Sequence, residues 1–344
     1  MTELLNNGTC PSNFTTMNMD TVSIRLVCLS IIGFLGITGN IMVILVTYTK
    51  IGRKSPTDYL IINNAVIDAI QSGIRLPLLL VNVAANCNAL GDFLCHFHGF
   101  LSGVCFIGSA YSLAALAVFR YFSVCKSPAI VLHTRHAVYA IGIVWMITLV
   151  ICLLPFLGLS VYEYSLMERS CLPSWGSSVA NRINAIIELI VDFIVPLVIT
   201  LTSYLQVFLT LRRIDHNLVR HVSNGGLQRR NTTSSRKPIH LTIALWLLVL
   251  NFLLCYITWS ILTFIIIPFS NYQISISDDL YFFSVTMLYV NNAINPAIYL
   301  VMLKSFRRRY IILLKKIFCW WNKRSSVVRV KPLKSDNTRE ENSK

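Results

Sequence analysis

The chain has 344 residues, of which 55% are hydrophobic and only 13% are charged, and its formal net charge is +15. Soluble proteins contain about 25% charged residues on average, so this composition excludes an ordinary soluble globular domain. An excess of basic residues can indicate a nucleic-acid partner. Here, however, the basic residues lie between and after long hydrophobic runs. The sequence therefore favours a membrane protein that binds no nucleic acid.

Seven hydrophobic stretches are long enough to cross a bilayer. About 20 helical residues span the ~30 Å of hydrocarbon, and each stretch is far longer than a barrel strand and lacks alternation. No internal repeat of the kind found in transporters is evident. We therefore predict an all-α membrane protein in which residues 24–303 form one bundle, with helices at 24–49, 59–81, 96–123, 137–160, 184–210, 239–267 and 280–303.

The distribution of basic residues predicts how the chain crosses the membrane. Lys and Arg gather after the first, third and fifth stretches and from residue 304 onward, and such loops stay in the cytoplasm. We therefore expect a plasma-membrane protein with an extracellular tail at 1–23 and a cytoplasmic C-terminus. Residues 1–20 lack the pattern of a cleavable signal peptide, so the first helix is expected to act as the signal anchor.

The predicted outer side contains sites for two modifications. Asn7 and Asn13 each begin an Asn-x-Thr sequon, which makes them glycosylation candidates. Four of the ten cysteines face the oxidising side, where disulfides persist; these are Cys10, Cys87, Cys95 and Cys171.

The region after the last hydrophobic stretch divides into a helix and a tail. Residues 306–318 place apolar side chains at helical spacing among basic ones, which predicts an amphipathic helix at 304–319 lying on anionic membrane lipids. Cys319, beside Trp320, is a palmitoylation candidate, with an unmodified cysteine as the alternative. Residues 320–344 form the predicted cytoplasmic tail.

Short motifs occur in a fixed order along the seven stretches. They are Asn40, Asn64 to Asp68, Cys95, Arg120-Tyr121, Trp145, Pro155, Pro196, Tyr204, Phe252, Cys255, Asn295-Pro296-Ala297-Ile298-Tyr299 and Phe306. This ordered set resembles the rhodopsin-like (class A) family of G-protein-coupled receptors, over about residues 24–319. The resemblance implies a signalling receptor and not an enzyme.

The resemblance also implies partners and roles for particular residues. An extracellular ligand and a heterotrimeric G protein are expected, with arrestin and receptor kinases acting on the C-terminal tail. Residues implied in activation and G-protein coupling are Arg120, Tyr121, Tyr204, Phe252, Pro296 and Tyr299. Cys95 and Cys171 match the bridge of the family. Cys10 and Cys87 then remain either as a second bridge or as two thiols.

A carboxylate in the second stretch needs partners inside the bundle. Asp68 is costly near the middle of a membrane unless it faces the interior. The resemblance places Asn40, Ser109, Asn291 and Asn295 around it, and these groups suit a sodium ion. The alternative is a polar cluster without an ion. No other cofactor is expected.

Three positions depart from the family pattern. Phe119 replaces the acidic residue that partners Arg120 in the resting state. Tyr256 and Thr258 stand where the sixth helix of the family usually has the tryptophan and proline of Trp-x-Pro. The loss of the resting ion pair predicts signalling without ligand. It also leaves open an alternative function, a non-signalling decoy or chaperone of the same fold.

The ligand pocket is expected among Ser102, Glu188, Asp192, Arg75, Tyr256 and Tyr289. Ser102 stands where amine receptors carry aspartate, and Tyr289 stands where visual pigments carry the lysine that binds retinal. Tyrosine forms no Schiff base, so a retinal pigment is excluded.

Two carboxylates offer a different anchor for a ligand. Glu188 and Asp192 lie four residues apart and so share one face of a regular helix. Three interpretations are open: the two carboxylates bind a cationic ligand group, they pair with Arg75, or they lie in water at the outer end of the helix. An acidic rim favours a basic peptide or amine on approach; it comprises Asp92, Glu163, Glu168, Asp278 and Asp279.

Overall fold

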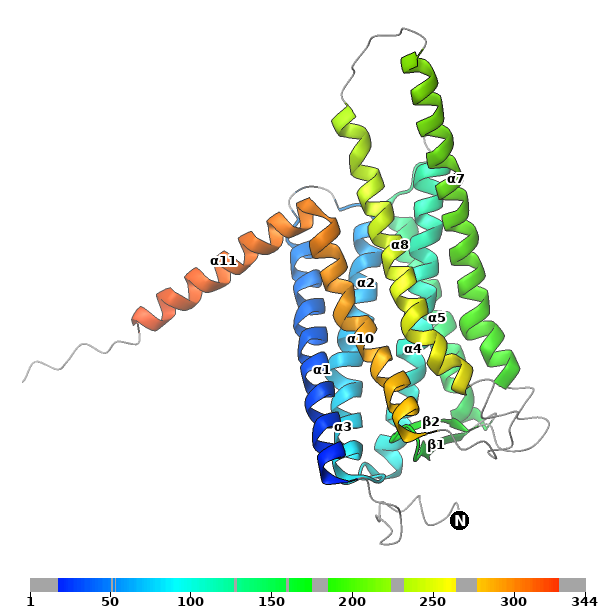
Figure 1. Ribbon diagram of the computed structural model, residues 1–344, viewed down its shortest axis with the longest axis vertical. Helices are drawn as coiled ribbons and strands as arrows, with labels where there is room; N and C mark the ends of the chain where they lie inside the picture. The colour runs from blue at the N-terminus through cyan, green and yellow to red at the C-terminus, as the bar shows by residue number, and fades with distance from the viewer. Residues whose placement is uncertain are drawn as a thin grey trace, which may run out of the picture.

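The structure is a computed structural model that describes residues 18–50, 52, 54–126, 129–158, 161–174, 185–223, 232–263 and 277–327. Side chains are described throughout these ranges except at 174, 215–223, 232–239 and 317–327. Long helices run side by side and form one bundle, with two short strands at one end (Figure 1). We call that end the sheet end and the opposite one, from which α11 departs, the α11 end.

The helices follow the hydrophobic stretches in chain order. Their bounds are α1 (Met19–Tyr48), α2 (Pro56–Ile70), η1 (Gln71–Arg75), α3 (Leu76–Ala85), α4 (Gly91–Cys125), α5 (Thr134–Leu153), η2 (Leu154–Leu157), η3 (Leu189–Ile194), α7 (Val195–Ser223), α8 (Thr232–Ile261), α10 (Asp278–Met302) and α11 (Lys304–Val327). The segments α2, η1 and α3 form one continuous helix over Pro56–Ala85. The predicted all-α bundle is therefore confirmed.

Six helices in the described ranges are long and apolar enough to cross a membrane. The helix α10 is less apolar because it contains Asp278, Asp279 and three asparagines, Asn291, Asn292 and Asn295. The three asparagines are buried within the bundle. Polar groups in a spanning helix must face protein rather than lipid, and the three asparagines of α10 meet this requirement.

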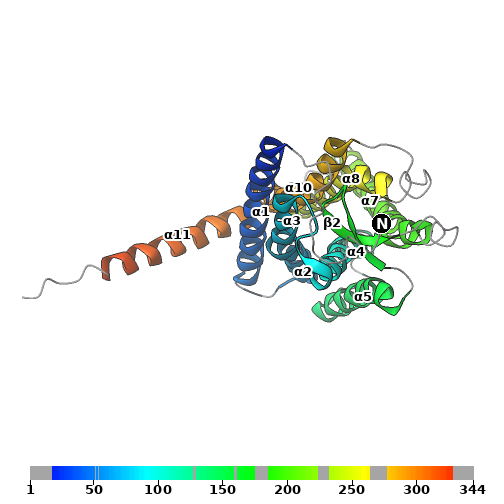
Figure 2. The same ribbon diagram turned by 90° about the horizontal axis from the view of Figure 1, so that it is seen from below.

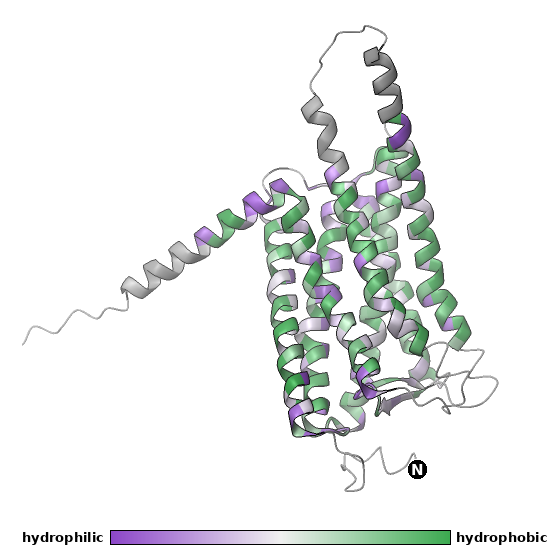
Figure 3. Cartoon of the chain, in the orientation of Figure 1, coloured by the Kyte–Doolittle hydropathy of each residue, from purple (hydrophilic) through white to green (hydrophobic). Residues whose placement is uncertain are grey.

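The helix α4 runs through the centre of the bundle. In its most apolar 18 residues 78% are buried, against 17% in the span Thr134–Leu157. Large apolar side chains are exposed on the outer helices, including Phe34, Tyr139, Met146 and Leu254. Figure 3 shows hydrophobic residues along much of the length of the helices and more hydrophilic ones toward their ends. An apolar outer surface of this kind is suited to lipid contact.

Local signals in the sequence fix where several helices begin and end. Ser55 and Asp58 form a capping box at the start of α2, with Pro56 in the first turn. Such a box satisfies backbone N–H groups that the helix leaves without partners. Ser277 caps α10 by accepting a hydrogen bond from the backbone N–H of Leu280 at 3.3 Å. At the other end of α3, Asn86 adopts the left-handed conformation and terminates the helix.

The structure adds a β-hairpin that the all-α prediction did not include. Strands β1 (Val161–Ser165) and β2 (Ser170–Ser174) pair antiparallel, with Tyr164 opposite Cys171. Seen from the sheet end, the strands lie across the space that the helices enclose (Figure 2). A disulfide joins Cys171 to Cys95 at the start of α4, which confirms the predicted bridge.

The helix α11 leaves the bundle directly after α10 and projects away from it (Figure 1). Phe306 is buried and packs against Tyr299, with ring centroids 5.9 Å apart. Farther along, Ile311, Ile312 and Leu314 are exposed among basic side chains. The predicted amphipathic helix at 304–319 is thus part of a longer helix that ends at Val327.

The disulfide generates a prediction about stability. We expect Cys95→Ala to lower the free energy of unfolding by about 2–5 kcal/mol, because the bridge restricts the unfolded chain. Thermal unfolding of the purified protein and its amount at the cell surface measure the effect. Cys28→Ala is the matched control, since Cys28 is an exposed, unbridged cysteine of α1. Reactive thiols at both Cys95 and Cys171 in the unreduced wild type would contradict the prediction.

Candidate functional site

Two π-helical turns shape the interior near the sheet end. η1 ends at Arg75 and η3 contains Asp192. A π turn is closed by a hydrogen bond between residues i and i+5, and such turns occur frequently at functional sites. Although η3 replaces the regular helical turn after Glu188, both Glu188 and Asp192 line the same cavity, as the expected shared face implied. Asp192 is buried, with 5% of its surface exposed, whereas Glu188 is half-buried.

A small cavity brings three of the predicted ligand-pocket residues together. Its lining includes Ser102, Glu188 and Asp192, together with Cys152, Tyr162 and Trp259. One carboxylate oxygen of Asp192, Oδ1, is buried and has no hydrogen-bond partner among the described residues. The volume is about 50 Å³, whereas ligand pockets commonly enclose roughly 300–1,000 Å³. A ligand must therefore displace side chains or the hairpin to enter.

Arg75 lies in a different part of the interior. Only 2% of its surface is exposed, and its guanidinium carbon is 5.3 Å from the centre of the Tyr289 ring. The charge of Arg75 interacts electrostatically with Tyr289, Cys105, Glu168 and Tyr256. Its Nε and Nη2 atoms have no hydrogen-bond partner within the described ranges. The structure thus places Arg75 near Tyr289 and Glu168 rather than in a network with Glu188 and Asp192.

Glu168 is the functional candidate that the sequence analysis missed. It was assigned to the acidic rim, but only 3% of its surface is exposed. Its Oε1 accepts hydrogen bonds from the indole Nε1 of Trp259 at 2.7 Å and from the hydroxyl of Tyr281 at 3.0 Å. Burial raises the pKa of Glu168 to about 7, while these hydrogen bonds and the charge of Arg75 oppose the rise.

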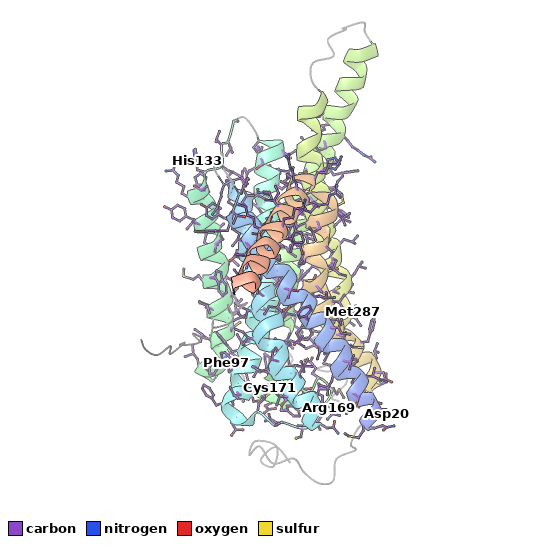
Figure 4. The ribbon with its side chains drawn as sticks, turned by 90° about the vertical axis from the view of Figure 1, so that its left-hand side faces the viewer. Asp20, Phe97, His133, Arg169, Cys171 and Met287 are labelled. Atoms are coloured by element: carbon purple, nitrogen blue, oxygen red, sulfur yellow. A yellow bond between two sulfur atoms is a disulfide. The ribbon has the colours of Figure 1, made fainter. Side chains whose placement is uncertain are left out.

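The negative charge of the predicted acidic rim is also lowered by an ion pair. Asp279 forms an ion pair with Arg25 at 3.0 Å, while Asp92, Glu163 and Asp278 are exposed. In Figure 4, Asp20, Arg169 and Cys171 lie at the sheet end of the molecule. With one carboxylate inside the bundle and another paired, the rim carries less negative charge than the sequence suggested.

Aromatic side chains connect the cavity with the middle of α8. The rings of Phe106 and Trp259 meet edge to face with centroids 5.3 Å apart, and Phe106 stacks on Tyr256 at the same separation. Tyr256 in turn stacks on Phe252 at 4.3 Å. The aromatic cluster Phe106–Tyr256–Phe252–Trp259 thus includes two predicted site residues. Close-packed rings of this kind transmit a displacement because they leave little space to absorb it.

The predicted coupling residues lie toward the α11 end. Arg120 is buried, and its Nε donates to the hydroxyl of Thr242 in α8 at 2.8 Å. Its charge also acts on Tyr204. The hydroxyls of Tyr204 and Tyr299 are buried and have no hydrogen-bond partner among the described residues. Tyr121, by contrast, is half-buried and packs against Phe122.

A polar cluster surrounds Asp68 in the middle of the bundle. Its Oδ2 accepts from the side-chain amides of Asn64 at 3.1 Å and Asn295 at 2.9 Å. Its Oδ1 is buried and has no hydrogen-bond partner in the described part of the chain, and the same holds for the Ser109 hydroxyl. The amide oxygens of Asn291 and Asn295 instead accept from Asn251 of α8.

The cluster fits a sodium ion only in part. Asp68 and Ser109 each offer an oxygen atom that the protein leaves without a partner, and hard cations bind oxygen ligands. Asn291 and Asn295 are predicted ligands whose oxygens are already engaged by α8. Beside Asn295, Pro296 packs closely on α1, since a Cβ at Gly39 would lie 2.8 Å from Pro296 Cγ.

Several predicted residues lie outside the described part of the chain. These are the glycosylation candidates Asn7 and Asn13, and Cys10; the side chain of Cys319 is likewise not described. Cys87 is buried and disulfide-bonded. Because Cys10 is outside the described residues, its pairing with Cys87 stays a prediction.

The geometry can be set beside known proteins. The family model "7 transmembrane receptor (rhodopsin family)" matches residues 39–299. Chicken (Gallus gallus) pinopsin is 30% identical over 278 residues, covering 79% of this chain and 74% of the relative. The melatonin receptor type 1A of Phodopus sungorus is 25% identical over 288 residues, covering 82% and 77%.

A solved structure agrees with the observed fold. The crystal structure of squid rhodopsin superposes with a TM-score of 0.77, covering 89% of this chain and 88% of that one at 18% sequence identity. At this identity the likeness bears on the fold alone. The family model, in contrast, matches most of the chain, including α4, α8 and α10. This protein therefore belongs to the rhodopsin family of seven-transmembrane receptors.

Proposed function

We propose that this receptor couples a ligand carrying a basic group to nucleotide exchange on a heterotrimeric G protein. The family and the relatives establish a G-protein-coupled receptor for extracellular signals, which is a signalling protein and not an enzyme. The observation that carries the ligand class is the cavity in which Asp192 and Glu188 lie together. A buried carboxylate is destabilised unless a cation or a hydrogen-bond donor compensates it, so a basic ligand group is the expected complement.

The proposed topology places the sheet end outside the cell and the α11 end in the cytoplasm of a plasma-membrane receptor. The Cys95–Cys171 disulfide at the sheet end suits an oxidising compartment. Basic residues gather at the α11 end, among them Lys50, Lys126 and Arg308, as expected for cytoplasmic loops. Glycosylation at Asn7 and Asn13, palmitoylation at Cys319, and binding of arrestin and receptor kinases to the tail are part of the same proposal.

The proposed ligand is neither retinal nor a monoamine held in the usual manner of the family. Tyr289 is buried against Arg75 and has no amine with which to form a Schiff base. Ser102 lines the cavity but carries no charge. A ligand cation in this cavity is therefore anchored from η3 rather than from α4.

The proposed activation step separates α8 from α4 at the α11 end. Phe119 has no charge with which to hold Arg120, but the hydroxyl of Thr242 accepts a hydrogen bond from it. This bond connects the two helices in a closed arrangement. A ligand activates the receptor to the extent that it binds an open arrangement more tightly. Arg120, Tyr204 and Tyr299 then become available to the G protein.

We also propose that a sodium ion binds beside Asp68. The Asp68 Oδ1 and Ser109 Oγ oxygens supply the ligands, and the ion compensates the buried carboxylate. The sodium ion stabilises the closed arrangement, because it would join Asp68 of α2 to Ser109 of α4. Asn295 of α10 donates a hydrogen bond to the same carboxylate.

The coupling proposal predicts the effect of losing the contact between α4 and α8. We expect Thr242→Val to raise ligand-free G-protein activation by about tenfold, because a hydrogen bond to a charged group contributes ~1.5–3 kcal/mol. Nucleotide exchange in membranes that contain equal amounts of receptor is the measurement. Thr202→Val, an exposed threonine of α7, is the matched control, and Arg120→Ala should abolish signalling.

The competing function makes the opposite prediction. A decoy or chaperone of the same fold would give no exchange above that of membranes without receptor, in the wild type and in Thr242→Val alike. That result, at normal surface expression, would reject the coupling proposal.

The ligand proposal predicts which side-chain change weakens agonists. We expect Asp192→Asn to raise the agonist concentration for half-maximal response by about 10-fold or more, since a charge-assisted hydrogen bond is worth ~1.5–3 kcal/mol. Dose–response curves with basic agonists from a screen of basic, neutral and acidic compounds provide the measurement. Asp92→Asn, an exposed carboxylate of α4 in the acidic rim, should have a much smaller effect, because a solvated charge contributes little to binding. Agonists that are acidic or neutral and insensitive to Asp192→Asn would overturn the ligand class.

The sodium proposal predicts a specific salt effect on stability. We expect NaCl to raise the melting temperature of the wild type more than KCl does at equal ionic strength. The reason is that the smaller sodium ion is the one proposed to bind Asp68 Oδ1 and Ser109 Oγ. Asp68→Asn should abolish that difference, while Asp92→Asn should leave it unchanged. Equal effects of the two salts on the wild type would indicate a polar cluster without an ion.

A further inference from the structure

The turn of the hairpin is held in a fixed position at the sheet end. Arg169 has a φ of 53°, a left-handed conformation that is uncommon for residues other than glycine. Its guanidinium Nη1 donates to the carbonyl oxygen of Asn86 at 3.3 Å. The next residue, Ser170, has its hydroxyl 3.4 Å from His98 Nδ1, and Cys171 is bridged to Cys95. Three successive residues are thus attached to the bundle, and Glu168 immediately before them points inward.

The first strand of the hairpin is held equally firmly. Tyr162 is buried, and its hydroxyl donates to the carbonyl oxygen of Cys152 at 2.9 Å. A Cβ at Gly99 would collide with the Tyr162 ring, so only glycine lets β1 approach α4 this closely. Because both strands are anchored, the position of Glu168 is set by the fold rather than by its own contacts.

The groups around Glu168 form a site for an anion. Trp259 of α8 and Tyr281 of α10 both donate to Oε1, and the Tyr281 hydroxyl is also 3.2 Å from the Thr263 hydroxyl. The positive charge of Arg75 in η1 acts on the same carboxylate. The second oxygen, Oε2, is buried and has no hydrogen-bond partner among the described residues. Two neutral donors from two spanning helices thus meet at a carboxylate that the hairpin supplies, and the charge of Arg75 acts on it without forming an ion pair.

We propose that the bundle contains an interior carboxylate-binding site, formed by the donors Trp259 and Tyr281 near the buried Arg75, and that Glu168 occupies it as a tethered ligand. The two hydrogen bonds to Oε1 connect α8 with α10, and the disulfide connects the hairpin to α4. In the same arrangement Arg120 of α4 is bonded to Thr242 of α8 at the opposite end. The tethered carboxylate therefore stabilises the closed receptor.

The site is distinct from the cavity proposed for a basic ligand group. That cavity is lined by Asp192 and Glu188, whereas the groups at Glu168 are hydrogen-bond donors and a cation. Only the signalling consequence of the tethered ligand rests on the proposed function. Occupancy of the site is a property of the folded protein and can be measured without a G protein.

Chemical complementation tests the site directly. Glu168→Ala removes the carboxylate and leaves space beside Trp259 and Tyr281. We expect the melting temperature of the purified receptor to fall by about 2–4 °C, and added acetate to restore it. Acetamide, which has the same shape without the charge, should restore less because Arg75 favours an anion. Glu163→Ala is the matched control, as an exposed glutamate of the same hairpin.

The results that overturn the proposal are equally specific. The first is that Glu168→Ala and Glu163→Ala melt at the same temperature. The second is that acetate shifts the melting temperature of the wild type and of Glu168→Ala by the same amount. If Glu168→Ala does not fold, Trp259→Phe and Glu168→Gln are compared singly and together. A tethered ligand predicts that the double variant loses much less than the sum of the single losses. Additive losses would show that the two side chains act independently.

A signalling measurement then separates this inference from the proposed function. We expect Glu168→Ala to raise ligand-free nucleotide exchange several-fold and acetate to reverse the increase. If the wild type and Thr242→Val both fail to activate a G protein, the proposed function is rejected. The melting experiments still show whether Glu168 occupies a carboxylate-binding site. If coupling is present but Glu168→Ala leaves basal exchange unchanged, the closing role of Glu168 is wrong.

Discussion

The disulfide between Cys95 and Cys171 is the link on which the geometry of the sheet end depends. It fixes β2 to α4, the helix that runs through the centre of the bundle. The register that places Tyr164 opposite Cys171 then sets β1, and the turn between the strands directs Glu168 inward. A covalent bond at the end of the bundle thereby determines which hydrogen bonds Trp259 and Tyr281 make in its interior.

Much of the fold could be predicted because the membrane imposes simple length and polarity requirements on a chain. Hydrophobic runs of spanning length located the helices, and the requirement that buried polar groups face protein explains the hydrogen bond between Asn295 and Asp68. The resemblance to the receptor family identified the disulfide between Cys95 and Cys171. These features are encoded locally or by a motif, so they are visible in one sequence.

The functional interior was less predictable for two physical reasons. Hydrophobic periodicity does not distinguish a π-helical turn from an α-helical one, so the sequence did not reveal that Arg75 and Asp192 lie in the π turns η1 and η3. A glutamate in a loop is normally solvated, so no local signal indicated that Glu168 is buried. Its position depends on the disulfide, the left-handed Arg169 and the helices α8 and α10 together. Such tertiary constraints become apparent only in the assembled bundle.

Trp259 connects the two proposed binding sites physically. Its side chain lines the cavity that contains Asp192, and its Nε1 donates to Glu168. The cavity is too small for a ligand without displacement of its lining, so a ligand that enters must compete with the position Trp259 now holds. Movement of the indole lengthens the bond to Glu168 and disturbs the stacked rings of Phe106, Tyr256 and Phe252. Because coupling between sites is reciprocal, a carboxylate that holds Trp259 in place must also weaken binding of a ligand that moves it.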